Sequence, residues 1–120
     1  RDVEVHLAAY DGAPEAGAVV HAHAPYALAC ATAGLTIAPA IVAAEPIGAV
    51  HVVGPGSDVA GVRAAIDAAR ARIAAFAAAV LIESHGVVVV GRDLAHAYDG
   101  LERVEACART TLWLRGEARA

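Results

Sequence analysis

The chain has 120 residues, a formal net charge of −4 and 58% hydrophobic residues, which describes one compact domain and not a disordered segment. Its nine positive residues are scattered, which argues against a nucleic-acid surface. No run of about 18 apolar residues predicts a transmembrane helix, and no signal peptide is recognisable. We therefore expect a cytoplasmic protein in which residues 1–120 form a single domain that binds neither nucleic acid nor a membrane.

Several kinds of chemistry are excluded by the residue types that the sequence lacks. Every positive residue is arginine, so no lysine side chain can form a Schiff base with a carbonyl substrate. Neither a dinucleotide-binding glycine motif nor a P-loop occurs. Cys30 and Cys107 both lie in alanine-rich, helix-like segments, where reduced and buried thiols are expected. The remaining reactive groups are carboxylates, histidines and any ion that the histidines hold.

Hydrophobic spacing and capping residues predict an alternation of helices and strands. Helices are expected at residues 2–10, 25–34, 57–74 and 93–114. Strands are expected at residues 17–23, 49–53, 79–82 and 87–90, with a short helix within the less regular residues 38–46. The short connection between the last two strands suits antiparallel neighbours. The pattern indicates an α/β fold with a mixed, largely antiparallel sheet layered with helices.

Two helices have apolar residues whose spacing predicts the face that packs inward. On the first helix, His6 and Tyr10 are expected to point inward, either as packing groups or as groups that contact the ligands of the site. On the third helix, the expected inward residues are Val59, Val62, Ile66 and Ile73.

The strongest functional signal is a pair of histidines in one strand, joined by a third histidine elsewhere. His21 and His23 lie in an apolar run, where side chains two residues apart point to the same face. Zinc binds neutral imidazole nitrogens at about 2.0–2.1 Å and usually takes a third or fourth ligand. His85, which precedes a glycine between two apolar runs, is the candidate third ligand. Partly buried histidines that only form hydrogen bonds are the alternative interpretation.

The other polar candidates have weaker signals. His51 is flanked by valines in a short predicted strand, and His96 is expected on the solvent side of the last helix. Glu83, close to His85, could orient an imidazole, although an exposed charge at the end of a strand is favoured.

The order of these motifs resembles the class II aldolase/adducin family. The resemblance rests on Asp2-x-x-x-His6 with Tyr10, on the strand from Ala18 to His23, on Pro55-Gly56-Ser57, and on the stretch from His85 to Gly91 followed by Ala97-Tyr98. It covers nearly the whole chain, and several spaced motifs in the right order are more specific than any one of them.

The resemblance implies a three-layer fold and a zinc or other divalent ion held by His21, His23 and His85. In such enzymes the ion binds the oxygens of a phosphorylated keto-sugar and stabilises the enediolate formed when a bond beside the carbonyl breaks. A carboxylate four residues before the histidine of the first helix moves the proton, and here that residue is Asp2. Glu4 is the alternative acid, two residues out of register. The structural alternative for Asp2 is a helix N-cap.

The family includes aldolases, 4-epimerases and a dehydratase, and the resemblance favours a class II aldolase-type lyase. Members normally carry a preceding segment with a phosphate pocket, so we expect this chain to be the C-terminal, metal-binding part of a longer domain. The family precedent also implies a homotetramer. The alternatives are an epimerase or dehydratase of the same family, or a non-catalytic, adducin-like interaction module.

Overall fold

The computed structural model describes residues 2–54 and 58–116. The helices are α1 (Asp2–Gly12), α2 (Pro25–Thr32), α3 (Asp58–Ala69), α4 (Ala71–Ala75) and α5 (Leu94–Leu114), with a 3₁₀ turn, η1, at Val42–Ala44. The strands are β1 (Ala18–Ala22), β2 (Val52–Val53), β3 (Ala77–Ile82) and β4 (Gly86–Gly91). The Pro55-Gly56-Ser57 motif lies outside the described residues. None of the described helices has the length and apolar character needed to cross a membrane.

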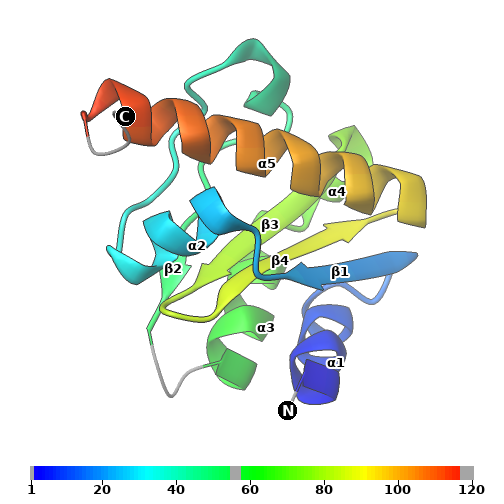
Figure 1. Cartoon of the computed structure of the whole chain (residues 1–120). Coiled ribbons are helices and arrows are strands. Elements are labelled where there is room, and N and C mark those ends of the chain that lie inside the picture. Colours follow the sequence, from blue (N-terminus) through cyan, green and yellow to red (C-terminus); the bar gives the residue numbers. More distant parts are fainter. Residues whose placement is uncertain (1, 55–57, 117–120) are drawn as a thin grey trace.

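The four strands form one mixed sheet in the order β1-β4-β3-β2 (Figure 1). The central strand β4 runs antiparallel to both β1 and β3, and only β2 pairs in parallel, with β3. The predicted mixed, largely antiparallel α/β fold is confirmed. Three residues join β3 to β4, and Ser84 within this tight turn has a φ of 58°, which non-glycine residues rarely adopt.

Helices cover both faces of the sheet, which gives the molecule three layers (Figure 1). Because strand side chains alternate, Val88 and Val90 of β4 join the hydrophobic cluster on the side of α1 and α3. Val87 and Val89 join the cluster on the side of α2 and α5. Burial on both faces explains why β3 and β4 are continuous apolar runs.

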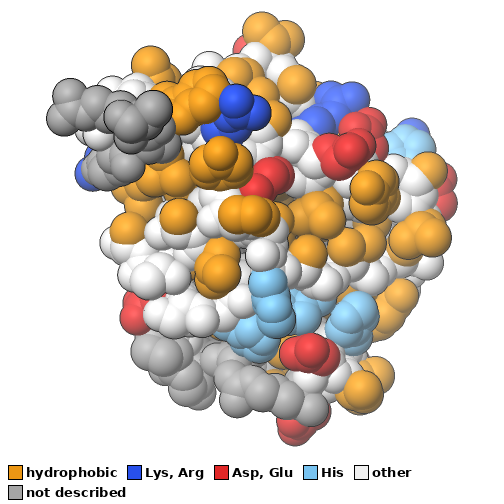
Figure 2. All heavy atoms as spheres, in the orientation of Figure 1, with side chains coloured by type: hydrophobic (Ala, Val, Ile, Leu, Met, Phe, Trp, Pro, Cys, Tyr) orange, Lys and Arg blue, Asp and Glu red, His pale blue; other side chains and the backbone are white. Residues whose placement is uncertain are grey.

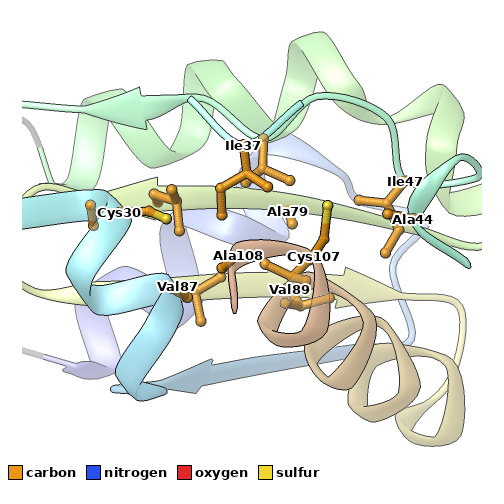
Figure 3. Packing of buried hydrophobic residues seen from close by; sticks show 14 of the residues in the cluster. Cys30, Ile37, Ala44, Ile47, Ala79, Val87, Val89, Cys107 and Ala108 are labelled. Atoms are coloured by element: carbon orange, nitrogen blue, oxygen red, sulfur yellow. The ribbon is translucent and has the colours of Figure 1, made fainter. Parts of the chain in front are cut away.

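Both cysteines belong to the hydrophobic cluster between the sheet and the helices α2 and α5 (Figure 3). They are buried thiols, as expected from the sequence. The Cys107 thiol donates a hydrogen bond to the Ala38 carbonyl at 3.2 Å and accepts one from the Ala40 amide at 3.4 Å. Cys107 therefore fixes the irregular segment before η1 to the middle of α5.

Helix α1 buries a different face from the predicted one. Its buried residues are Val5, Ala8, Ala9 and Gly12, whereas Tyr10 is 38% exposed and His6 is half-buried. The reason is close packing against α3, because a Cβ atom on Gly12 would lie only 2.5 Å from the Arg63 carbonyl oxygen. The prediction for Tyr10 was wrong, since small residues and not large ones face the neighbouring helix.

The predicted helix at residues 57–74 is divided in two at Arg70. The Arg70 guanidinium donates hydrogen bonds to both carboxylate oxygens of Glu15, at 2.7 and 3.1 Å. Val62, Ile66 and Ile73 are buried as predicted. Val59 is 47% exposed, so the inward face was predicted wrongly at that position.

We expect Gly12→Ala to lower the free energy of unfolding by about 1–3 kcal/mol, because the added methyl group forces α1 away from the α3 backbone. Urea denaturation followed by circular dichroism measures the change. Gly54→Ala is the matched control, since a Cβ atom at Gly54 meets nothing within 4 Å. Equal effects of the two substitutions would refute the close approach of α1 and α3.

Candidate metal centre

His21 is held on the α1 side of the sheet by its strand and by a hydrogen bond to its ring. It pairs with Val88 across the β1–β4 ladder, and its side chain is only 4% exposed. Its Nδ1 atom lies 3.0 Å from the Val87 carbonyl oxygen. Because a carbonyl oxygen can only accept, Nδ1 carries the proton and Nε2 keeps a lone pair for a metal.

Burial lowers the pKa of His21 below its ordinary value, against the opposing effect of the hydrogen bond to Val87. The desolvated ring therefore stays neutral to a lower pH than an exposed histidine. Neutral imidazole is the form that binds a metal ion. The environment of His21 thus favours its ligating state.

The three predicted histidines converge. One potential ligand atom from each of His21, His23 and His85 lies within 4.8 Å of the other two. The Nε2 atoms of His21 and His85 are 3.2 Å apart, close to the separation of about 3.4 Å that two nitrogens have on a tetrahedral zinc ion. Figure 2 shows histidine side chains gathered on one face of the molecule, with an acidic side chain beside them. The donor set fits a divalent metal ion.

The approach of the β3–β4 turn to the end of β1 brings His85 to this cluster. Gly86 follows His85 and has a φ of 154°, a conformation that favours glycine. A Cβ atom on Gly86 would lie 2.4 Å from the Ala22 carbonyl oxygen and 3.0 Å from Cδ2 of His23. The absence of a side chain at Gly86 therefore allows the two ligand-bearing segments to meet.

Helix α1 places the carboxylate of Asp2 beside the histidines. Its Oδ1 atom lies 3.6 Å from Nε2 of His21 and 3.6 Å from Nε2 of His85. Asp2 is part of the first helical turn, and its side chain is 61% exposed. The carboxylate thus borders the histidine cluster and is open to solvent.

The remaining histidines lie at different distances from the cluster. The His6 ring centroid is 6.4 Å from that of His21, so His6 borders the site. His51 is exposed just before β2. His96 interacts with Asp93 through Nδ1 at 2.7 Å at the start of α5. Glu83 is half-buried in the β3–β4 turn, and its amide donates to the Val53 carbonyl at 2.9 Å.

One participant in the site could not be inferred from the sequence. The Val87 carbonyl group sets the tautomer of His21, but a backbone acceptor leaves no signal in residue type. The hydrogen bond between His21 and the Val87 carbonyl can be inferred only when the register of β1 and β4 is known.

Residues 1–112 match the family of class II aldolase and adducin N-terminal domains. The chain belongs to this family. It is 34% identical over 119 residues to a 3-oxo-tetronate 4-phosphate decarboxylase of Pectobacterium atrosepticum, covering 91% of this chain and 51% of the relative. The chain thus spans about half the length of that curated relative.

Solved structures share the fold. An L-fuculose-1-phosphate aldolase from Thermus thermophilus matches 98% of this chain and 64% of its own, with a TM-score of 0.75 and 24% identity. YgbL of Escherichia coli, described as a putative aldolase/epimerase/decarboxylase, matches 98% of this chain and 58% of its own, with a TM-score of 0.70 and 27% identity. The three-layer arrangement is therefore that of class II aldolases.

Gly86→Ala is expected to lower metal affinity about tenfold or more, because the new methyl group separates the end of β1 from the β3–β4 turn. Isothermal titration with Zn²⁺ measures the affinity. Gly34→Ala serves as the control for a glycine of positive φ, 66°, that lies in open space. An unchanged zinc affinity in Gly86→Ala would show that the close approach does not position the ligands.

Proposed function

We propose that this chain carries the metal centre of a lyase whose substrate is a small phosphorylated keto-sugar or keto-acid, and which breaks a carbon–carbon bond of the carbon next to the carbonyl group, so that this carbon keeps the electron pair. The observation that supports it is the convergence of the ligand atoms of His21, His23 and His85, with the Asp2 carboxylate beside them. The fold shared with an L-fuculose-1-phosphate aldolase and the identity to a sugar-acid phosphate decarboxylase agree with this chemistry.

His21, His23 and His85 are the proposed ligands of a divalent ion, for which we favour Zn²⁺. Such an ion supplies Lewis-acid stabilisation of the negative charge that develops on substrate oxygens. Three protein ligands are typical of catalytic zinc sites, whereas structural sites usually have four. The three histidines would hold this ion beside the sheet, and the exposed Asp2 carboxylate lies next to them.

Asp2 is the proposed acid and base. Its carboxylate holds or accepts the proton at the substrate carbon next to the carbonyl, or at the hydroxyl group whose loss of a proton starts the cleavage. Its distance of 3.6 Å from two imidazole nitrogens leaves room for it to turn from the histidines towards a substrate. No lysine is present to offer a covalent route instead.

Decarboxylation is the second candidate, and the 34% identical relative supports it. Aldol cleavage and decarboxylation of a 3-keto acid both leave an electron pair on the carbon beside a carbonyl. They differ in the fragment released, an aldehyde in one case and carbon dioxide in the other. Product analysis with L-fuculose 1-phosphate and 3-oxo-tetronate 4-phosphate separates them.

A non-catalytic scaffold has no need of three converging imidazoles. Metal analysis of the purified protein tests the difference. One divalent ion per chain supports the enzyme, and a chain that binds no divalent ion is a scaffold.

His21→Ala, His23→Ala and His85→Ala should each weaken zinc binding at least tenfold, since each removes one nitrogen from the proposed set. Equilibrium competition with a chromogenic chelator gives the dissociation constants. His51→Ala and His96→Ala are matched controls, because both residues lie apart from the cluster. A control variant that loses zinc as strongly as His85→Ala would overturn the ligand assignment.

Asp2→Asn should keep the zinc content but slow solvent deuterium exchange at the substrate carbon about 100-fold or more, because an amide cannot accept a proton. Proton NMR of the substrate in D₂O measures the exchange. Asp11→Asn removes an exposed acid from the same helix and should leave the rate unchanged. Wild-type exchange in Asp2→Asn would exclude Asp2 as the base.

A further inference from the structure

Helix α2 begins two residues after His23 and lacks the usual means of capping its own N-terminus. The N-cap residue is Ala24, which has no side-chain oxygen, and Pro25 occupies the first helical position. The amides of Tyr26 and Ala27 are therefore left for an acceptor elsewhere in the chain.

Glu105, in the middle of α5, provides that acceptor. Its Oε2 atom accepts from the Tyr26 amide at 2.9 Å, and its Oε1 atom accepts from the Ala27 amide at 2.8 Å. A carboxylate is favourable here because the N-terminus of a helix carries partial positive charge. The cap thus comes from a residue far away in the sequence, and it joins α2 to α5, which lie side by side in Figure 1.

This join bears on His23, which lies between the end of β1 and the start of α2. His23 is exposed, and no hydrogen bond to its imidazole is present among the described residues. The backbone on its two sides therefore sets its position. On one side β1 is paired with β4, and on the other the helix start is held by Glu105.

Helix α5 is itself a firm support, because it packs directly on the sheet. Gly100 lets α5 approach so closely that a Cβ atom there would lie 2.9 Å from Cγ1 of Val89 in β4. The same strand begins next to His85. Through Glu105, the start of α2 is thus connected to the strand that follows the third ligand.

We propose that Glu105 is a positioning residue for the metal centre. By fixing the first turn of α2 to α5, Glu105 keeps His23 in the position from which it can bind the metal ion together with His21 and His85. This inference rests on the proposed function, because it requires the three histidines to bind a metal ion. It assigns a role to a carboxylate that lies outside the ligand set, on the opposite face of the sheet from α1.

The test uses Co²⁺, whose absorption bands report its coordination geometry and which substitutes for Zn²⁺ in nitrogen-ligand sites. Glu105→Gln should raise the Co²⁺ dissociation constant about tenfold and weaken the visible bands, because one of the two amide hydrogen bonds is lost. Glu102→Gln is the matched control. It replaces an exposed carboxylate on the same helix, three residues away. The amides of Tyr26 and Ala27 both donate to Glu105, so Glu102→Gln leaves these hydrogen bonds in place.

A double-mutant cycle shows whether the effect passes through His23. In a His23→Ala background, Glu105→Gln should weaken Co²⁺ binding no further. If the two substitutions have independent, additive effects on the dissociation constant, Glu105 does not act through His23 and the proposal is overturned.

A third variant separates positioning from simple helix capping. Ala24→Ser in the Glu105→Gln chain supplies a local cap and should restore the melting temperature, but not the Co²⁺ affinity, because one of the two hydrogen bonds between α2 and α5 stays lost. If the Co²⁺ affinity recovered as well, Glu105 would act only as a helix cap, and the proposed positioning role would be refuted. A wild-type chain that binds no Co²⁺ would refute the proposed metal centre together with this inference, whereas normal binding by Glu105→Gln would refute the inference alone.

Discussion

The pairing of β1 with β4 is the constraint on which the candidate site depends. These strands are far apart in the sequence, and their register sets Ala22 opposite Val87. That register turns the His21 ring towards α1 and brings its Nδ1 atom to the Val87 carbonyl. A shift by one residue would turn His21 to the other face of the sheet. The orientation of His21 in the candidate site thus depends on the register of β1 and β4.

The layers contribute to the site in different ways. The sheet supplies the three imidazoles from β1 and from the β3–β4 turn, and α1 supplies the Asp2 carboxylate to the side of the sheet on which it packs. The layer of α2 and α5 contributes no residue to the histidine cluster, but Glu105 of α5 caps the start of α2, which directly follows the segment that carries His23. Small residues make this possible, because Gly12 and Gly100 let helices lie close to their neighbours. An alanine-rich core therefore brings polar groups from separate layers within a few ångströms of one another.

Local pattern was sufficient to predict the hairpin of β3 and β4 and the long helix α5, because hydrophobic spacing and turn length fix those features within short stretches. Local pattern also put His21 and His23 on one face of a strand, whereas their meeting with His85 depends on the long-range pairing of β1 with β4 and was expected from the context of His85 and the order of the family's motifs. Local pattern failed where a choice depended on distant residues. Helix α1 has apolar residues on more than one face, and only contact with α3 decides that the face with Gly12 is buried. Likewise, the break at Arg70 coincides with its pairing to Glu15, and the cap from Glu105 had only one sequence signal, a helix start at Ala24-Pro25 without a capping side chain.

The arrangement of the described residues also bears on which part of the proposed chemistry they would determine. Three imidazoles converge beside the sheet, and the Asp2 carboxylate next to them is exposed, so an ion held by the three histidines would keep a position for a further ligand, as in catalytic sites. Charge stabilisation beside a carbonyl is common to aldol cleavage and to decarboxylation, so a single arrangement of ligands serves both of the chemistries named for the relatives. The two reactions differ in the leaving group, which is an aldehyde in one case and carbon dioxide in the other. In the proposed site the histidines and Asp2 would therefore supply what the two reactions share, and the choice between them would depend on groups that contact the leaving fragment.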